Sequence, residues 1–249
     1  SPCIEAYKWF LIAAMQGDED GAYMLAQSYY NGKGVKQNYA EALRWFRQSA
    51  AHGTPEAQHN VGVMYREGQG VPQNYAEALR WFQLAAKQGY AESQYNVGAM
   101  YATGQGVTRE LIEAQRWFRM AADQGSAHGQ HATGTFFYYI STNYAEAIKW
   151  FRLAAAQGFA EAQVQLGSMY YKGEGVEKNF AEASKWYKLA AAQGVASAKP
   201  DLSPLDGLYQ RDIYKWYELA AAEGDVKAQK GLAKVYGSDF NTTNHNDIR

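Results

Sequence analysis

The decapeptide Gln37–Phe46, QNYAEALRWF, decides the architecture, because the same ten letters return at Gln73–Phe82, 36 residues further on. A catalytic motif has no reason to recur unaltered, whereas a structural unit that buries the same face in every copy does. The tryptophans keep the same register, with spacings of 30 to 36 residues: Trp9, Trp45, Trp81, Trp117, Trp150, Trp186 and Trp216. The chain is therefore predicted to be an array of about seven repeats.

Each repeat contains a predicted helix around its tryptophan, which we call helix B. Asn38 and Asn74 each stand three residues before a glutamate, Glu41 or Glu77, which is an asparagine version of the capping box at a helix start. An aromatic residue follows every tryptophan, and a glycine stands eight positions after it. A glycine there suits the left-handed conformation that commonly ends a helix. Helix B is thus predicted to run from the asparagine to the glycine.

A second predicted helix, helix A, fills the other half of each repeat, for example Glu56–Tyr65. It carries a central glycine, Gly62 in this copy, and ends in Gly-x-Gly-Val at Gly68–Val71. A glycine inside a helix costs roughly 1 kcal/mol relative to alanine, so its recurrence predicts that another helix approaches closely there. Two glycines in the turn permit a sharp reversal of the chain.

These residues together resemble the Sel1-like repeat family, a relative of the tetratricopeptide arrays. One full copy of the pattern consists of Ala57, Gly62, Tyr65, Gly68, Gly70, Val71, Ala78, Trp81, Ala85, Ala86 and Gly89. The resemblance implies an all-α fold, a right-handed superhelical solenoid of about seven antiparallel helix pairs. It also implies that helix A lines the concave side and that the molecule holds other macromolecules.

The repeat array is expected to cover residues 1–237, with irregularities at 135–142 and 198–208. The first irregular segment lacks the Gly-x-Gly turn, and the second contains Pro200 and Pro204, each costing about 3 kcal/mol in a helix interior. Residues 238–249 are polar and are expected to form a disordered tail. Neither end of the array has a polar cap, so a longer natural protein or a dimer through the uncapped solenoid ends is expected.

The composition argues against several classes of partner. With 24 basic and 25 acidic side chains, the chain has no overall attraction for nucleic acid. No apolar run reaches the 18 or more residues of a membrane helix, so no membrane insertion is expected. The single cysteine, Cys3, excludes an internal disulfide and a thiolate zinc site.

No reactive constellation emerges, so no catalytic residue, metal or cofactor is predicted. The Gly-x-Gly turns never extend to Gly-x-Gly-x-x-Gly. His128 and His131 have a metal-like i, i+3 spacing without an apparent third ligand, and the variation of partner-facing residues explains them better. Acidic residues followed three positions later by basic ones, such as Glu77 and Arg80, are interpreted as exposed ion pairs on helix B.

Specificity is expected at helix A positions that differ between otherwise similar repeats. Sites 14, 18 and 21 after the preceding tryptophan share one helix face. They carry Tyr, His, Asn and Arg, the types that dominate protein-binding hot spots. The alternative is that these side chains only pack between neighbouring helices. The predicted partner-binding residues are Tyr23, Tyr30, His59, Asn60, Arg66, Tyr95, Asn96, His131, Tyr138, Gln165 and Tyr171.

The sequence therefore predicts a non-enzymatic protein–protein interaction scaffold that binds a peptide or a folded partner on its concave face. Members of the resembling family occur in bacterial envelopes and among secreted proteins, which implies a bacterial periplasmic or secreted location in an envelope, secretion or host-interaction context. A cytoplasmic location is the alternative. Two other functions stay open: a binder or hydrolase directed at cell-wall carbohydrate, and a structural spacer that assembles through its ends.

Overall fold

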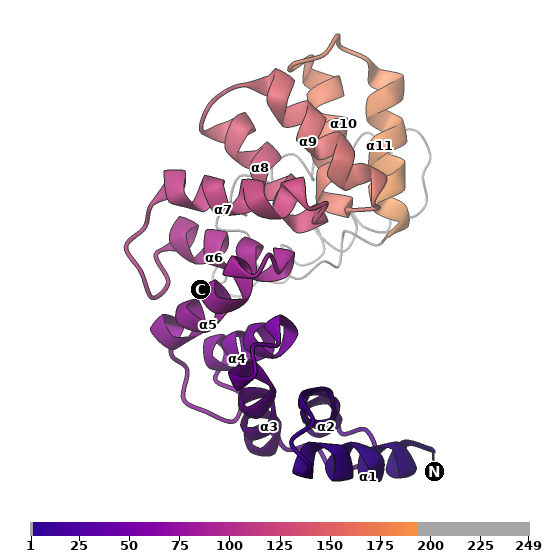
Figure 1. Cartoon of the computed structure of the whole chain (residues 1–249). Coiled ribbons are helices and arrows are strands. Elements are labelled where there is room, and N and C mark those ends of the chain that lie inside the picture. Colours follow the sequence, from indigo (N-terminus) through magenta and orange to yellow (C-terminus); the bar gives the residue numbers. More distant parts are fainter. Residues whose placement is uncertain (1, 194–249) are drawn as a thin grey trace, which may run out of the picture. The chain divides into compact units, whose positions relative to one another are not determined.

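The structure is a computed structural model that describes residues 2–193, and these form eleven α-helices joined by short turns (Figure 1). The predicted fold class, an all-α solenoid of antiparallel helix pairs, is confirmed in this part of the chain. The helices are α1 Pro2–Met15, α2 Glu19–Asn31, α3 Tyr39–Ala51, α4 Pro55–Glu67, α5 Tyr75–Lys87, α6 Ala91–Thr103, α7 Leu111–Asp123, α8 Ala127–Tyr139, α9 Tyr144–Ala156, α10 Ala160–Lys172 and α11 Phe180–Ala192.

The chain divides into two compact units. The first, Ser1–Gln124, contains α1 to α7, and the second, Gly125–Arg249, contains α8 to α11 among its described residues. In both units odd-numbered helices are helix B and even-numbered helices are helix A, and within a unit each helix packs against its neighbours in the chain. The predicted irregularity at 198–208, the tail at 238–249 and the C-terminal end of the array lie outside the described residues.

The predicted start of helix B is confirmed, with one correction to its capping. The side chains of Asn38, Asn74 and Asn143 accept a hydrogen bond from the backbone N–H three residues later, at 3.1 Å in each case. The glutamates do not make the second hydrogen bond of a capping box, in which the glutamate side chain accepts from the backbone N–H of the cap residue. The backbone N–H of Asn74 instead donates to the carbonyl of Tyr65, at 2.9 Å. Tertiary packing has satisfied that donor, so the glutamate is available for an ion pair.

Helix A meets helix B at the central glycine, as its recurrence predicted. A Cβ atom built on Gly62 would lie 2.8 Å from the ring of Phe82, and one on Gly134 would lie 2.8 Å from the ring of Phe151. Both rings are fully buried. In each helix pair, the aromatic residue that follows the tryptophan of helix B therefore packs against the backbone of helix A at a glycine, which has no side chain.

The Gly-x-Gly turn brings consecutive repeats together. Its first glycine ends helix A in the left-handed conformation, for example Gly68 at φ 70°. The second glycine, Gly70, also has φ 70°, and a Cβ atom on it would lie 2.5 Å from the carbonyl carbon of Tyr39 in the preceding helix B. Glycine is thus required at this position both by the backbone conformation and by the close approach.

The turn between α8 and α9 is built differently, since the sequence there has no Gly-x-Gly. Helix α8 ends at Tyr139, and Ile140 keeps a right-handed helical conformation. Thr142 takes φ 49° and is the one non-glycine residue with positive φ among the described residues. Asn143 still caps α9, so the helix start is preserved although the loop is shorter.

A series of glutamine pairs, each with an exposed donor and a buried acceptor, links the end of helix B to the helix A before it in each unit. The side-chain amide of Gln88 donates to Gln58 at 2.8 Å, Gln124 to Gln94 at 2.6 Å, Gln157 to Gln130 at 2.8 Å, and Gln193 to Gln163 at 2.8 Å. The acceptor glutamines are at most 6% exposed, and buried polar groups are stable only when hydrogen-bonded. The pairs therefore add a specific hydrogen bond to the apolar packing between helix A and helix B.

Candidate functional site

The predicted partner-binding residues all lie on helix A, and we call the surface they define the helix-A face. In the first unit it consists of Tyr23 and Tyr30 on α2, His59, Asn60 and Arg66 on α4, and Tyr95 and Asn96 on α6. In the second unit it consists of His131 and Tyr138 on α8, and Gln165 and Tyr171 on α10. In the first unit, hydrogen bonds join members on consecutive helices A: Tyr23 with Asn60, and Arg66 with Asn96.

Most aromatic members rest with one side against a helix B ring. Tyr23 lies 5.6 Å from Phe46 between ring centroids, Tyr95 lies 5.7 Å from Phe118, and Tyr171 lies 5.4 Å from Phe180. Aromatic pairs at such distances contribute about 0.5–1.5 kcal/mol beyond their buried area. These side chains therefore pack between helices on one side, while the three tyrosines remain partly exposed on the other.

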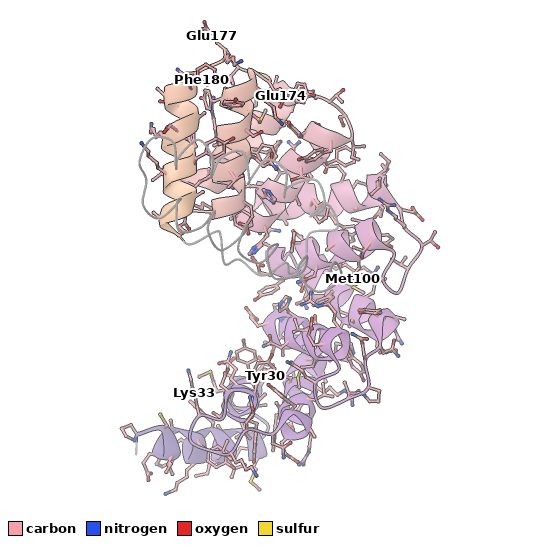
Figure 2. The ribbon with its side chains drawn as sticks, turned by 180° about the vertical axis from the view of Figure 1, so that it is seen from behind. Tyr30, Lys33, Met100, Glu174, Glu177 and Phe180 are labelled. Carbon is pink, nitrogen blue, oxygen red and sulfur yellow. The ribbon has the colours of Figure 1, made fainter. Side chains whose placement is uncertain are left out.

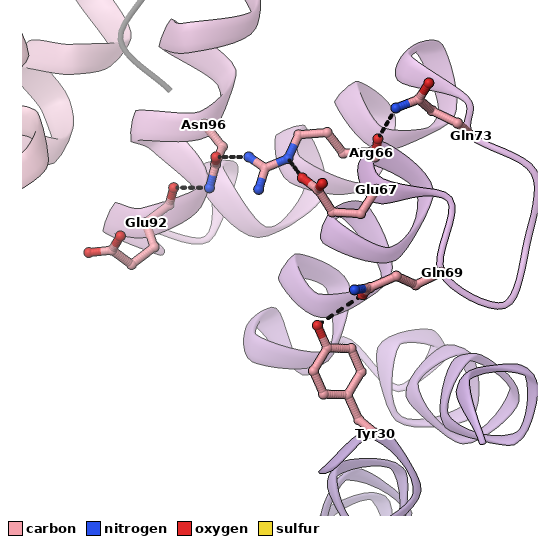
Figure 3. A network of polar contacts seen from close by, with 7 residues as sticks. All are labelled: Tyr30, Arg66, Glu67, Gln69, Gln73, Glu92 and Asn96. Atoms are coloured by element: carbon pink, nitrogen blue, oxygen red, sulfur yellow. Dashed lines mark hydrogen bonds and ion pairs between the residues drawn. The ribbon is translucent and has the colours of Figure 1, made fainter. Parts of the chain in front are cut away.

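Hydrogen bonds connect consecutive repeats along the helix-A face of the first unit (Figure 3). Arg66 is at the centre: its Nη1 donates to Oδ1 of Asn96 at 2.6 Å, and its Nε donates to Oε1 of Glu67 at 2.7 Å. The guanidinium carbon also lies 5.7 Å from the centroid of the Phe82 ring. Only 15% of the Arg66 side chain is exposed, so this cation is held in one orientation rather than moving in solvent.

Two tyrosine hydroxyls make separate hydrogen bonds on the N-terminal part of this face. Tyr30 donates to Oε1 of Gln69 at 2.9 Å, a contact between α2 and the turn after α4 (Figure 3). The Tyr23 hydroxyl accepts from the amide of Gln27 at 2.8 Å and from Asn60 at 3.4 Å. Hydrogen bonds within the chain thus hold the polar tips of this face in place.

His59 is part of the packing beneath these tips. Its Nδ1 lies 2.9 Å from the hydroxyl of Ser93, and its ring lies 5.4 Å from Phe82 and 5.2 Å from Tyr90. Burial lowers the pKa of His59 to about 4, and the positive charge of Arg66 adds to the effect. The imidazole is therefore neutral at pH 7, since burial disfavours the charged form.

The helix-A face of the second unit is more deeply buried. His131 lies 5.7 Å from Phe151 and 5.0 Å from Phe159, and burial lowers its pKa to about 3, with His128 adding to the shift. Tyr138 donates to Oε2 of Glu174 at 2.5 Å, and Lys172 donates to the Tyr138 hydroxyl at 3.3 Å. Glu174, Glu177 and Phe180 mark this turn region in Figure 2.

The structure separates predicted residues that can meet a partner from those that cannot do so without rearrangement. Asn96, His131, Tyr138 and Gln165 are at most 8% exposed, whereas the other seven are partly exposed. Gln165 is only 1% exposed, and neither its side-chain oxygen nor its nitrogen has a hydrogen-bond partner within the part of the chain that the structure describes. The accessible surface is therefore concentrated in the first unit, on Tyr23, Tyr30, His59, Asn60, Arg66 and Tyr95.

Sequence reasoning missed two residues that accept from a tyrosine hydroxyl, Gln69 in the first unit and Glu174 in the second. Each is the middle residue of a Gly-x-Gly turn, and each accepts from a tyrosine on the preceding helix A, Tyr30 or Tyr138. A signal was present, because the middle position varies between Lys33, Gln69, Gln105 and Glu174 while both glycines stay fixed. Figure 2 labels Lys33, which holds this middle position in the turn after α2.

The two histidines with metal-like spacing and the acidic–basic pairs have defined neighbours in the structure. His128 lies 5.0 Å from the Phe159 ring, as His131 does, and no group of three His, Cys, Asp or Glu side chains suited to a metal occurs in the described part of the chain. The predicted ion pairs are confirmed on helix B, for example between Glu77 and Arg80 at 2.8 Å. Among the described helices, none is long and apolar enough to cross a membrane.

The paired helices and the regularly spaced glycines, tryptophans and tyrosines define a helical repeat protein. The Sel1 repeat model matches residues 3–18, 19–54, 55–90, 91–126, 131–159, 160–195 and 214–225. The chain belongs to the Sel1 repeat family. The comparison with curated proteins found no match.

Solved structures share the fold. A protective antigen present in uropathogenic Escherichia coli strains, which displays an SLR fold, is 36% identical with a TM-score of 0.74. The match covers 92% of this chain and 51% of the antigen, so the chain spans about half of that protein's length. A Sel1 repeat protein from Oxalobacter formigenes is 26% identical, with a TM-score of 0.75 and coverage of 87% and 84%. An immunity protein from Pseudomonas aeruginosa, 21% identical with a TM-score of 0.51 and coverage of 84% and 83%, shares the fold alone.

Proposed function

We propose that the chain is a non-enzymatic scaffold that binds a protein or peptide partner on its helix-A face. The observation that carries the proposal is a pair of hydrogen bonds between consecutive repeats on this face: Arg66 donates to Asn96 at 2.6 Å, and Tyr30 donates to Gln69 at 2.9 Å. Side chains held in place before binding lose less conformational entropy when a partner arrives.

The residue types of the accessible part support a protein partner. Tyr23, Tyr30 and Tyr95 combine large apolar area with a polar tip, and Arg66 adds a fixed cation. Tyrosine and arginine are enriched among the residues that dominate the binding energy of protein interfaces. His59 contributes shape rather than charge, because its imidazole is neutral at pH 7.

An extracytoplasmic location in a bacterium is part of the proposal. The likeness to the Escherichia coli antigen supports it, since an antigen that protects must be met by the host. Fractionation of the native host tests this point separately, and recovery of the protein with the cytoplasmic fraction alone would contradict it.

Photo-crosslinking in the native host tests the binding surface. A photoreactive amino acid replaces Tyr23 or Tyr95, which are partly exposed, and a matched control replaces Arg80, an exposed residue on helix B. We expect one dominant protein adduct from the first two positions and none from the control. The same adducts from all three positions, or adducts only to the chain itself, would refute binding on the helix-A face.

A further inference from the structure

We propose that the helix-A face of the first unit binds an arginine side chain of its partner, with the guanidinium against Tyr90 and paired with Glu56 and Glu92. These residues and a second tyrosine form what we call the acidic–aromatic cluster: Tyr23 on α2, Glu56 on α4, and Tyr90 and Glu92 at the start of α6. All four are partly exposed. The inference rests on the proposed function, because it names a chemical group of that partner.

Two consecutive residues of α4 bring the tyrosines of the cluster to one place. The ring of His59 lies 5.2 Å from that of Tyr90. The amide of Asn60 donates to the Tyr23 hydroxyl at 3.4 Å. His59 is held in turn by the hydroxyl of Ser93 on α6, which lies 2.9 Å from its Nδ1. Because its imidazole is neutral at pH 7, His59 supports the Tyr90 ring without repelling a cation.

The repeat register places the carboxylate of Glu56 beside Tyr90. In the second unit, Phe159 occupies the repeat position of Tyr90, and the ring of His128 lies 5.0 Å from it. Glu56 and His128 each stand eleven residues after a tryptophan, so they hold the same position on their helices. A carboxylate therefore stands in the first unit where the second unit has an aromatic ring.

Two carboxylates and a second phenol lie around the hydroxyl of Tyr90. Burial raises the pKa of Tyr90, and the phenol of Tyr23 and the carboxylates of Glu56 and Glu92 add to the effect. The carboxylates disfavour a further negative charge at this point and favour a positive one, since opposite charges attract. The cluster is thus complementary to a cation.

Glu56 differs from the glutamates of helix B, because it has no cation of its own. Those glutamates pair with a basic residue three positions later, for example Glu77 with Arg80 at 2.8 Å and Glu113 with Arg116 at 3.0 Å. The carboxylate of Glu56 has neither a hydrogen bond nor an ion pair with another residue in the described part of the chain, although Glu56 is partly buried. A partly desolvated carboxylate is stabilised when a cation reaches it, and the partner's arginine supplies that cation.

The helix dipole accounts for an acid at this position but not for the ring beside it. Acidic residues in the first turn of helix A are stabilised by the positive end of the helix, and they occur on α2, α4, α6 and α10. Tyr90 is the one tyrosine among the N-cap residues of the described helices A; the others are Asp18, Thr54, Ser126 and Phe159. A tyrosine ring with one carboxylate on the preceding helix and another in its own first turn is therefore specific to α4 and α6.

The cation of the same helix, Arg66, lies at the other end of the face. It follows Glu56 by ten residues, which is about 15 Å along a helix. Its Nε is paired with Glu67 at 2.7 Å, and Figure 3 shows the carboxylate of Glu92 directed away from it. The start of α4 and α6 is therefore the acidic end of the face, and an incoming arginine is attracted there.

Arginine fits the cluster better than lysine does. Its planar guanidinium stacks on an aromatic ring and donates from its edges to carboxylates at the same time. A lysine ammonium is a compact, strongly hydrated charge without such a plane. One carboxylate on each of two neighbouring helices, with a ring between them, matches the guanidinium.

Small probes test the site in the full chain without a partner. The probes are Nα-acetyl-arginine amide and Nα-acetyl-citrulline amide, whose side chains have the same shape although only the first is charged. Binding is followed by nuclear magnetic resonance of the backbone N–H groups. We expect saturable shifts at residues 56–60 and 90–92, with binding of the citrulline probe about tenfold weaker or more, since the carboxylates recognise the charge. Equal affinities of the two probes, or shifts at other residues only, would overturn the proposal.

Two matched variants test the carboxylate. Glu56→Gln removes the charge and keeps the shape, and Glu161→Gln removes an acid at the same repeat position on α10 in the second unit. Circular dichroism checks that both remain folded. We expect the affinity for the arginine probe to fall about threefold or more in the first variant and to stay unchanged in the second. Equal affinities of the two variants would contradict pairing with Glu56.

A third variant tests the ring. Tyr90→Leu keeps an apolar side chain against His59 but removes the aromatic face that attracts a cation. The affinity for the arginine probe is expected to fall about threefold, the usual contribution of a cation–π contact near a surface. An unchanged affinity would show that the guanidinium does not lie on Tyr90.

Crosslinking from residue 95 in the native host separates this inference from the proposed function. A photoreactive amino acid replaces Tyr95 in the otherwise unaltered chain and in the Glu56→Gln variant. We expect a weaker adduct in the variant, and an equal adduct would overturn the arginine site while the proposed function stands. Binding of the arginine probe without an adduct in either chain would refute the proposed function and leave the arginine site in place.

Discussion

Gly70 lies directly against Tyr39, so that a Cβ atom at residue 70 would fall 2.5 Å from the Tyr39 carbonyl carbon. The same relationship joins Gly106 to Tyr75, at 2.6 Å, and Gly175 to Tyr144, at 2.7 Å from the carbonyl oxygen. The second glycine of each turn therefore sets how closely one repeat approaches the previous one. It links the local requirement of a tight turn to the stacking of the solenoid.

Replacing Gly70 with alanine is expected to lower the free energy of unfolding by about 2–4 kcal/mol, because strain at positive φ adds to overpacking. Gly53→Ala is the matched control, since Gly53 has φ 99° but nothing lies within 4 Å of a Cβ atom there. The control should lose only the conformational part, about 1–2 kcal/mol. Urea unfolding followed by tryptophan fluorescence measures both, and equal losses would contradict the close approach.

The identical decapeptides allow the helix cap to be tested twice in one chain. Asn38→Ala and Asn74→Ala should each cost about 1 kcal/mol, because each removes the acceptor for the N–H of Glu41 or Glu77. Glu77→Gln should change stability by less than about 0.5 kcal/mol, since its pair with the largely exposed Arg80 is screened by solvent. Thermal unfolding of the three variants decides the point; a larger loss from Glu77→Gln than from Asn74→Ala would show that the ion pair matters more.

The contact between Arg66 and Asn96 is expected to be energetically coupled. In a double-mutant cycle with Arg66→Ala and Asn96→Ala, we expect an interaction energy of about 1 kcal/mol or more, because the bond is charge-assisted and Asn96 is only 8% exposed. Chemical denaturation of the wild type, both single variants and the double variant measures it. Additive effects would show that the bond contributes no net stability.

Stability is expected to fall in acid because of the buried histidines. The pKa of His131 in the folded chain is about 3, below its ordinary value of 6.5, so the unfolded chain binds a proton that the folded chain does not. The stability that the neutral ring contributes is complete above pH 6.5 and is lost as the pH falls from there toward 3. Protonation of His59, with a pKa of about 4, acts in the same direction.

His131→Tyr isolates this contribution, since tyrosine occupies the same repeat position at Tyr23 and Tyr95. Melting temperatures of the variant should fall less steeply than those of the wild type between pH 6.5 and pH 4. Parallel pH profiles would show that His131 does not change its protonation on unfolding.

Much of the fold could be predicted because its signals are local. The N-cap at Asn74, the left-handed Gly68 and the acidic–basic pair of Glu77 and Arg80 each depend on residues within a few positions along one helix. Gly62 predicted a close neighbour, and the structure identifies that neighbour as Phe82. The reciprocal half of the capping box was wrong for Asn74, because its N–H is satisfied by Tyr65 of the preceding helix, which no local pattern encodes.

The candidate site was predictable as a face but not residue by residue. Periodicity placed Tyr30, Arg66 and Asn96 on helix A, and the structure joins Arg66 to Asn96. The periodicity could not show that Tyr30 is partly exposed while Tyr138, at the same repeat position, is 7% exposed. Exposure depends on the side chains that neighbouring repeats supply, and these differ between the units.

The sequence by itself determined the repeat period, the alternation of helices A and B, and the residues that begin and end them, because each follows from backbone conformation within one repeat. Only the tertiary structure decided which side chains of the helix-A face meet solvent and which polar groups pair across repeats. Burial and hydrogen bonding between repeats join atoms some 30 residues apart in the chain, such as Arg66 and Asn96. The distance between two such atoms is fixed only when the helices pack together.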